Sequence, residues 1–198
     1  MPRVSKEAKA ESHARILNAA ARLYRERGIE ATSVGEVTKA AGMTHGGFYR
    51  HFGSKDDLTV AAIEHSVGAL ARTLEGLIAE HGGDAGVRSY VEMYLSEEHI
   101  ADPGKGCPIA ALASETANAS DVVREAMSAG SDRIVGLLGS ALDLSPLDTR
   151  RQAAGLFANL VGAVVMARTT TSREAALDIV EGCRQSINRL LGPPTASN

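Results

Sequence analysis

The segment from Ser33 to Leu58, SVGEVTKAAGMTHGGFYRHFGSKDDL, constrains the fold more strongly than any other part of this 198-residue chain. Ser33 and Glu36 have the spacing of a capping box, in which the serine hydroxyl accepts from a free helical N–H and the glutamate reaches back to the serine N–H. Gly42 can supply the left-handed turn that ends a helix. We therefore predict two short helices joined by a tight turn.

The second of these helices should be short, basic and aromatic. Thr44 is a suitable N-cap residue, and the helix should extend to about His51. Phe48 and Phe52 lie four residues apart, so they should share one face and point toward the core. This arrangement is typical of a helix-turn-helix DNA reader.

A second capping box lies at the end of the segment. Ser54 and Asp57 repeat the spacing and predict a long helix that continues to about Glu80. The expected buried side of this helix comprises Leu58, Ala62, Leu70, Leu74, Leu77 and Ile78. The helix should therefore leave the reader and join it to the rest of the chain.

A helix is also expected ahead of the segment, from about Ala10 to Arg27, with Gly28 placed to end it. One helical face holds its apolar residues, which are Ile16, Leu17, Ala20, Leu23 and Tyr24. Residues 1–8 should form a loose, basic arm. In the helix after Ser33, the residues expected to face inward are Val37, Ala40 and Ala41, with Met43 in the corner.

The remainder of the chain carries helix signals and lacks convincing runs of alternating β-branched residues. Further helices are expected from Ala85 to about Ile100, from Pro108 to about Asn118, from a Ser120 cap to about Leu142, from Pro146 to about Thr169 and from a Ser172 cap to about Leu191. Ser145, Pro146 and Asp148 combine an N-cap, a proline at the first helical position and an acidic third residue. We therefore predict an all-α fold.

Charge is divided unequally along the chain. Residues 1–55 contain ten Lys/Arg and five Asp/Glu, a net charge of +5, whereas residues 56–198 contain eleven and nineteen, a net charge of −8. A basic N-terminal part on an acidic remainder predicts that only the N-terminal part meets a polyanion such as DNA. Chance segregation of surface charge would give the same numbers, so charge alone does not decide.

Other function classes find little support in the sequence. Cys107 and Cys183 are too few and too far apart for a disulfide framework or a CxxC metal site. No phosphate-binding glycine loop, HExxH motif or serine-centred elbow is present, so we expect neither an enzyme nor a cofactor. The N-terminus is too polar for a signal peptide, and the apolar run at 153–167 is shorter than the ~18 residues of a membrane span. A cytoplasmic protein is expected.

The segment resembles a known family once the residues just before it are included. GIEATSVGEVTKAAGMTHGGFYRHFGSKDDL is similar to the DNA-binding domain of the TetR family of transcriptional regulators, nearly position by position over AGMTHGGFYRHFGSKDDL. The remainder of the chain matches that family only in size and helix layout. The resemblance implies a homodimer with a helix-turn-helix domain at residues 1–53 and a helical effector-binding and dimerisation domain at residues 54–198.

DNA recognition needs phosphate contacts that position the protein and base contacts that specify the sequence. The resemblance assigns phosphate contacts to Tyr49 and to the helix start at Thr32 and Ser33, whose free N–H groups suit a phosphate, and His51 is a similar candidate. Lys55 lies one residue past a helix N-cap, where its charge and the helix dipole both favour a phosphate. The residues expected to contact DNA are Thr32, Ser33, Thr44, His45, Gly46, Gly47, Tyr49, Arg50, His51 and Lys55.

Base readout should come from the start of the recognition helix. Thr44 and His45 occupy the position that enters the major groove in this motif, with Arg50 as a further candidate. Gly46 and Gly47 cost a helix about 1 kcal/mol each relative to alanine, which close approach of the backbone to DNA would explain. The family often has a hydroxyl residue where Gly47 stands, so a side-chain base contact is missing here.

Each of these assignments has a simpler structural alternative. Ser33 can act only as a cap, and Tyr49 can be a core ring. His45 can be an exposed surface histidine, and His51 can make an internal hydrogen bond. The sequence leaves these alternatives open.

The two C-terminal helices predict a dimer interface. Residues 153–167, AAGLFANLVGAVVMA, are apolar almost all round, so this helix must be covered on more than one side. The last helix adds an apolar stripe of Ala176, Ile179, Val180, Cys183, Ile187, Leu190 and Leu191. Helices at about 146–169 and 172–191 from two chains would form a four-helix interface. A deeply buried monomer core is the alternative.

An effector pocket is expected among the helices between Ala61 and Met166. Its candidate liners, any of which could instead be simple core, are Leu70, Tyr90, Tyr94, Cys107, Leu112, Met127, Phe157 and Met166. Cys107 carries a second hypothesis, because a helix start and the nearby Lys105 both favour the reactive thiolate. Its Gly-Cys-Pro element is similar to one in a branch of the family with members that respond to electrophiles or oxidants. A small buried residue is the alternative.

The sequence therefore predicts a dimeric, sequence-specific repressor that binds a palindromic operator and is released by a small-molecule effector. A switch by modification of the Cys107 thiol is the second hypothesis. A non-specific DNA-binding protein is the third, which the acidic C-terminal part disfavours. In a dimer, the two recognition helices should lie about 34 Å or a multiple of it apart, to meet successive major grooves.

Overall fold

The computed structural model describes residues 6–142 and 146–193, apart from the side chains of His45 and of residues 146–148. Within these ranges the chain is helical and has no strand, which confirms the predicted all-α fold. The first four helices are α1 (Lys6–Arg27), α2 (Val34–Ala40), α3 (His45–Phe48) and α4 (Lys55–His81). The others are α5 (Gly83–Tyr94), α6 (Glu97–Ala101), the 3₁₀ turn η1 (Pro103–Lys105), α7 (Pro108–Thr116), α8 (Asp121–Ala141), α9 (Pro146–Thr169) and α10 (Arg173–Leu191).

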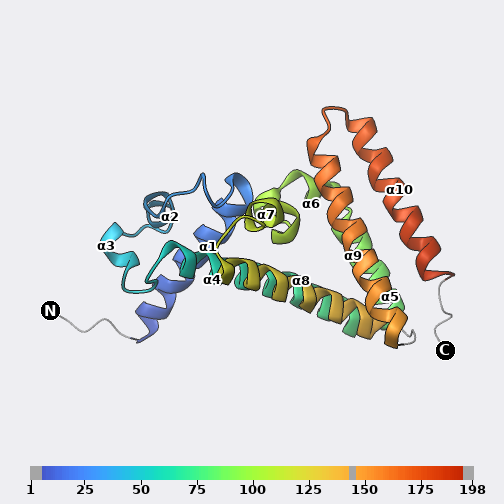
Figure 1. Ribbon diagram of the computed structural model, residues 1–198, viewed down its shortest axis with the longest axis horizontal. Coiled ribbons are helices and arrows are strands. Elements are labelled where there is room, and N and C mark those ends of the chain that lie inside the picture. Colours follow the sequence, from blue (N-terminus) through green and yellow to red (C-terminus); the bar gives the residue numbers. More distant parts are fainter. Residues whose placement is uncertain (1–5, 143–145, 194–198) are drawn as a thin grey trace.

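The helices form an elongated molecule with two different ends (Figure 1). Helices α1, α2 and α3 gather at one end, and the long helices α4 and α8 pack against each other along the middle. Helices α9 and α10 pack against each other at the opposite end. No helix in the described ranges is long and apolar enough to cross a membrane.

Buried apolar side chains hold the first three helices together, and they belong to a core that continues into the larger part. Ile16 and Tyr24 from α1 are buried, as are Val37 from α2 and Phe48 from α3. The Phe48 and Phe52 rings stack with their centroids 5.7 Å apart, and both face this core as predicted. Each large side chain that is fully buried here contributes about 1.5–3 kcal/mol of transfer free energy.

Three local predictions at this end are corrected. Helix α1 begins at Lys6 rather than Ala10, because residues 6–10 are lysine, glutamate and alanine, which all favour helix. Residues 6–8 are therefore not part of a loose arm, and residues 1–5 lie outside the described part of the chain. Ala40 is exposed rather than inward-facing.

The third correction concerns the length of α3, which ends at Phe48 instead of His51. From there the backbone tightens into turns, in which the Arg50 and His51 N–H groups donate three residues back, to Gly47 and Phe48. A helix of one turn that contains two glycines has little intrinsic stability, so its position depends on the residues around it.

The capping residues agree with the sequence in part. At α2 the Ser33 Oγ accepts from the Glu36 N–H at 3.2 Å, and the Glu36 carboxylate accepts from the Ser33 N–H at 2.8 Å, so the capping box is complete. At α4 the Ser54 Oγ accepts from the Asp57 N–H at 3.0 Å. The Asp57 carboxylate, however, accepts from the N–H of Gly53 rather than from that of Ser54.

Two predictions in the larger part are also corrected. The single helix expected from Ala85 to Ile100 is divided at Leu95, because the Ser96 Oγ accepts from the His99 N–H and starts α6. Ser120 occupies the N-cap position of α8 but makes no side-chain capping bond, and its hydroxyl donates to Asp56 of α4 at 2.6 Å. Helix α9 begins at Pro146 as predicted, although Ser145 and the Asp148 side chain lie outside the described residues.

Candidate nucleic-acid interface

The turn between α2 and α3 sets the direction of the recognition helix. Gly42 has a φ of 66°, a left-handed conformation that suits glycine. The Gly42 N–H donates to the Lys39 carbonyl at 3.1 Å, and the Met43 N–H donates to the Thr38 carbonyl at 2.8 Å. These bonds close α2 and hold the start of α3 in a fixed orientation.

The first turn of α3 presents backbone to the solvent. Gly46 is exposed, and a β-carbon added there would meet no atom within 4 Å. A β-carbon on Gly47 would lie 3.2 Å from the Met43 Cε, so a side chain there would require a small shift of the Met43 methyl group. Thr44 is exposed at the N-cap position but makes no side-chain capping bond. The side chain of His45 is not among those described.

Tyr49, Arg50 and Lys55 surround this turn. The Tyr49 side chain is 61% exposed, and its ring meets the edge of the Phe48 ring with the centroids 5.1 Å apart. The core-ring alternative for Tyr49 is therefore wrong, whereas Phe48 is the core ring. Arg50 is exposed, and Lys55 is the first residue of α4, where its positive charge lies beside the helix N-terminus.

His51 lies at the edge of the same surface. Its ring is half-buried beside His13, with the centroids 5.7 Å apart. Burial, and then the positive charges of His13, Lys9 and Arg50, lower the pKa of His51 below its ordinary value. The Nδ1 atom is buried without a hydrogen-bond partner among the described residues, which disfavours the internal hydrogen bond considered from the sequence. The positive surroundings suit a phosphate instead.

Thr32 and Ser33 differ, although the sequence grouped them. Thr32 is only 1% exposed, and its hydroxyl donates to the Gly28 carbonyl at 2.8 Å, so the predicted phosphate contact by this side chain is corrected. Ser33 is exposed, and its hydroxyl donates to the Glu36 carboxylate at 2.8 Å while it caps α2. Ser33 therefore remains the candidate of the two.

The residues predicted for an effector pocket lie mostly in the core of the larger part. Tyr90, Tyr94, Cys107, Leu112, Met127 and Phe157 are all buried. The Tyr90 hydroxyl has no hydrogen-bond partner within the described residues. Leu70 is half-buried and lines a cavity at the junction with α1. Met166, in contrast, is 56% exposed on α9.

The surroundings of Cys107 differ from those expected of a reactive thiol. The side chain is fully buried, and burial raises the pKa of the Cys107 thiol above its ordinary value. The neighbouring Tyr94 hydroxyl and the N–H groups of Ile109 and Ala110 lower that pKa, but burial outweighs them. Lys105 is exposed and pairs with Asp102 at 3.2 Å. The predicted activation of this thiol by Lys105 is therefore wrong in this conformation.

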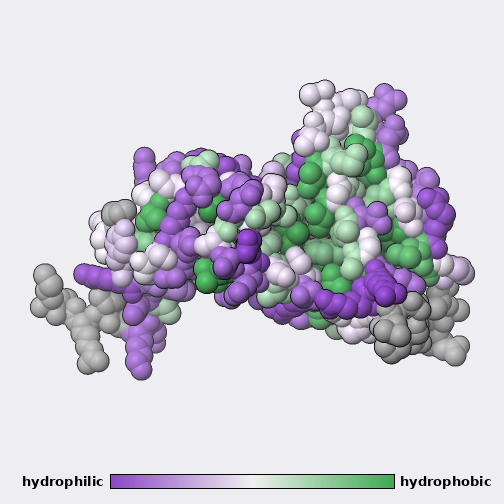
Figure 2. All heavy atoms as spheres, in the orientation of Figure 1, coloured by the Kyte–Doolittle hydropathy of each residue, from purple (hydrophilic) through white to green (hydrophobic). Residues whose placement is uncertain are grey.

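The far end of the molecule carries an uncovered apolar surface. Val165 and Met166 on α9 are exposed, as are Leu177 and Leu190 on α10. Figure 2 shows hydrophobic side chains gathered over these two helices. Val180 and Ile187, in contrast, pack into the chain's own core. The apolar residues of both helices are thus divided between an inner face and an outer one.

Two family models match the chain in the regions of this geometry. The model described as bacterial regulatory proteins, tetR family, matches residues 16–62, and that of the LmrA/YxaF-like transcriptional regulator C-terminal domain matches residues 85–182. The fold and these matches define a helix-turn-helix transcription regulator that binds DNA. The chain belongs to the TetR family.

Individual relatives agree with this assignment. The chain is 26% identical to the transcriptional repressor NemR of Escherichia coli over 184 residues, which cover 86% of this chain and 91% of that protein. It is 45% identical to AcrR of Shigella flexneri over 58 residues, which cover 29% of this chain and 27% of AcrR. These relatives are regulators of transcription.

Solved structures show the same fold. The reduced form of E. coli NemR superposes with a TM-score of 0.79 and 23% identity, over 93% of this chain and 99% of that one. A TetR transcriptional regulator from Legionella pneumophila superposes with a TM-score of 0.76 and 19% identity, over 96% and 98%. At these identities the likeness concerns the fold alone.

Proposed function

We propose that the chain is a homodimeric repressor that binds a palindromic operator through α3 and is released from it by a small-molecule effector. The observation that carries this proposal is the exposed first turn of α3, with open backbone at Gly46 and the exposed Tyr49 and Arg50 beside it. Open backbone flanked by hydrogen-bond donors suits a duplex groove with a phosphate on each side. Readout by Thr44 and His45, and phosphate contacts by Ser33, Tyr49, His51 and Lys55, belong to this proposal.

The dimer is proposed to form through the outer faces of α9 and α10. Val165, Met166, Leu177 and Leu190 are exposed there, and a second copy would cover them. A two-fold interface at this end leaves α1, α2 and α3 free at the other end, which is a requirement for two recognition helices to meet one face of a duplex.

We propose residues 1–53 and 54–198 as the two domains. Release by an effector requires a physical connection between them. The Glu115 carboxylate on α7 accepts from the N–H groups of Ile29 at 2.8 Å and Glu30 at 3.2 Å, at the end of α1. Arg25 of α1, which donates to the Gly104 carbonyl and to the Ser66 hydroxyl of α4, provides a second connection. An effector that favours one arrangement of α7 and α4 would therefore reposition the reader.

A switch by the Cys107 thiol is the second candidate. The N–H groups at the start of α7 and the Tyr94 hydroxyl favour its thiolate, although burial opposes them. Such a switch needs an opening of the core before reaction. Labelling the thiol with a maleimide and following operator binding in wild type and Cys107→Ser tests it. If the variant loses modification but still responds to the same compound, this candidate fails.

The proposed function is tested by DNA binding of the full chain. Fluorescence anisotropy with duplexes from the DNA flanking its own gene, and with scrambled duplexes of equal length, measures specificity. Tyr49→Ala and Lys55→Ala should weaken binding to every duplex, whereas His45→Ala should also reduce the preference for the operator. Arg124→Ala, an exposed change of the same charge on α8, is the control. Unchanged affinity in the first three variants would refute the assignment.

A further inference from the structure

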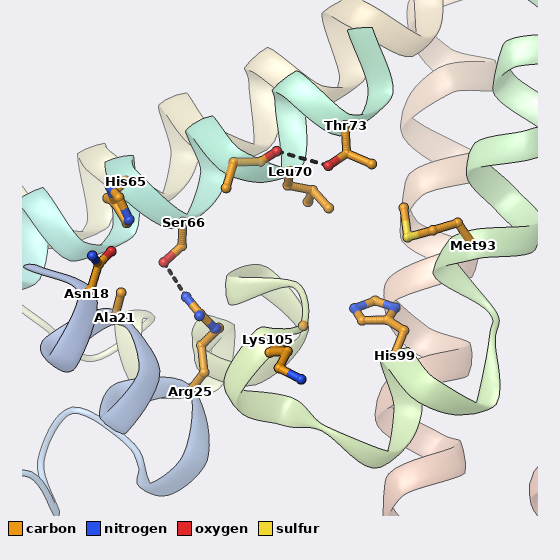
Figure 3. A pocket seen from close by; sticks show the side chains of 12 residues that line it. Asn18, Ala21, Arg25, His65, Ser66, Leu70, Thr73, Met93, His99 and Lys105 are labelled. Atoms are coloured by element: carbon orange, nitrogen blue, oxygen red, sulfur yellow. Dashed lines mark hydrogen bonds between the residues drawn. The ribbon is translucent and has the colours of Figure 1, made fainter. Parts of the chain in front are cut away.

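A cavity of about 210 Å³ lies at the junction of the two proposed domains (Figure 3). Helix α1 contributes Arg25, α4 contributes His65 and Leu70, and the chain from α5 to η1 contributes Met93, His99 and Lys105. Pockets for drug-sized molecules have volumes of about 300–1,000 Å³. This cavity is smaller, so it suits a compact molecule.

The charge of the lining is one-sided. None of the twelve lining residues carries a carboxylate, whereas Arg25 and Lys105 carry positive charge. His99 contributes no charge, because its Nε2 accepts from the Cys107 N–H at 2.9 Å and its Nδ1 bonds the Tyr94 carbonyl, which together require the neutral ring. Arginine and lysine without a carboxylate in the same cavity favour a negatively charged occupant.

Arg25 has donors left for such an occupant. Its Nε donates to the Gly104 carbonyl at 2.9 Å, one Nη2 N–H donates to the same oxygen, and one Nη1 N–H donates to the Ser66 hydroxyl. These bonds occupy three of the five guanidinium N–H groups. The other two have no partner among the described residues. Arg25 donates all three bonds to neutral acceptors. Its half-buried charge is therefore without a direct ion pair in the described part of the chain.

The Lys105 ammonium can exchange its present partner for a bound anion. Lys105 is exposed, and its Nζ pairs with Asp102 at 3.2 Å. Surface ion pairs of this kind contribute about 0–1 kcal/mol, so exchange of Asp102 for a bound anion is inexpensive. Leu70, Met93 and Ala21 supply apolar surface on the remaining sides. The cavity therefore joins two cations to an apolar wall.

We propose that this cavity binds a small organic carboxylate with a compact apolar body, and that this anion is the effector. The carboxylate would meet the free N–H groups of Arg25 and the Lys105 ammonium, while the apolar body would lie against Leu70 and Met93. Arg25 belongs to α1, and the other groups belong to the larger part. A bound anion therefore contacts both domains and favours one arrangement of them, which is the condition for coupling. The effector role rests on the proposed function, whereas the binding site does not.

Calorimetric titration of the DNA-free full chain tests the site. The probes are butyrate, hexanoate and benzoate, each compared with its neutral amide, which has nearly the same shape. At least one carboxylate should bind roughly tenfold or more tightly than its amide, since hydrogen bonds to charged groups contribute about 1.5–3 kcal/mol each. Arg25→Met and Lys105→Met should each reduce that binding severalfold. Arg22→Met is the matched control, because Arg22 lies on the same helix and is exposed.

Two outcomes would overturn the site. One is equal binding of acids and amides, or no binding of any acid. The other is carboxylate binding that neither Arg25→Met nor Lys105→Met weakens. The Lys105 side chain is 77% exposed, so its variant remains informative if Arg25→Met fails to fold.

Operator binding then tests the effector role separately. The preferred carboxylate should weaken operator affinity of the wild type and leave Lys105→Met less affected at the same concentration. Binding of the carboxylate without any change in operator affinity would overturn the effector role alone. A chain that binds no operator in the absence of ligand would instead refute the proposed function, while calorimetry would still decide the site.

Discussion

The surface around α3 and the core around Cys107 are built in opposite ways. At α3 the candidate residues come from one short segment, are mostly exposed and make few internal bonds. Around Cys107 the candidate residues come from separate elements and are buried, and the half-buried His99 ring bonds the Tyr94 carbonyl and the Cys107 N–H. The first surface can meet a partner without rearrangement, whereas the second must open or shift first. The proposed DNA contact therefore uses an exposed surface, whereas the proposed switch uses a buried core.

The largest expected effect concerns the outer face of α9. Met166→Asp should convert the proposed dimer into a monomer, because an unpartnered charge buried in an interface costs about 3 kcal/mol or more, and two-fold symmetry places it there twice. Sedimentation equilibrium should show a dimer dissociation constant raised by roughly a hundredfold or more. Val122→Asp is the control, since Val122 is also an exposed apolar residue but lies on α8. Retention of the dimer by Met166→Asp would place the interface elsewhere.

The next effect concerns phosphate contacts beside α3. Lys55→Met should weaken binding to all duplexes by about tenfold and reduce the slope of log K against log salt by about one per subunit. Binding measured from low to high salt gives both quantities. A variant with the wild-type slope would show that Lys55 does not meet a phosphate.

Capping patterns in the sequence predicted several helix starts correctly. They were sufficient for α2, α4 and α10, where Ser33, Ser54 and Ser172 cap their own helices as expected. They failed at Ser120, whose hydroxyl donates to Asp56, 64 residues away in the chain, and accepts no capping bond. A capping pattern specifies only which bond is possible. The tertiary neighbours decide which bond forms.

The same distinction explains why the cavity lined by Arg25 could not be predicted from the sequence. The residues at the start of α3 could be found because they are contiguous and resemble a family segment. Arg25 meets Ser66 and Gly104 across separations of 41 and 79 residues, and no spacing in the sequence indicates such a meeting. The predicted activation of the Cys107 thiol was wrong for the same reason, because burial raises its pKa more than the N–H groups at the helix start lower it.

An effect of intermediate size is expected at the contact between α7 and the end of α1. Glu115→Ala removes the acceptor of the Ile29 and Glu30 N–H groups and should lower the free energy of unfolding by about 1–3 kcal/mol. Chemical denaturation measures the change, with Glu125→Ala on the exposed side of α8 as the control. A Glu115 variant as stable as the control would remove this connection from the account.

A smaller effect sharpens the role of the glycine pair. Gly46→Ala should stabilise α3 by up to about 1 kcal/mol, because alanine favours helix and a β-carbon there meets no atom of the chain. Operator affinity should nevertheless fall if the backbone approaches the duplex closely. Thermal unfolding and anisotropy measured on the same variant separate the two effects. A gain in stability with unchanged operator affinity would leave Gly46 without a role in recognition.

The smallest effect is a dependence of stability on pH. Burial lowers the pKa of His99, so the folded chain holds its ring neutral while the unfolded chain takes up a proton below about pH 6.5. The unfolded state then binds more protons, and stability falls as the pH decreases through this range. Denaturation at pH 7.5 and 5.5 should show a smaller loss in His99→Gln than in wild type. Equal losses would mean that other groups, such as His51 and His65, whose pKa values burial also lowers, account for the dependence.

The central claim is that α3 reads a DNA sequence. A salt titration of the full chain on its operator palindrome, and on a scrambled duplex of the same length and composition, tests this claim most directly. The account predicts tighter binding to the palindrome at every salt concentration, with a preference that His45→Ala reduces while it keeps the salt slope. Equal affinity for both duplexes across the titration would contradict the account, and would identify the basic end of the molecule as a non-specific DNA-binding surface.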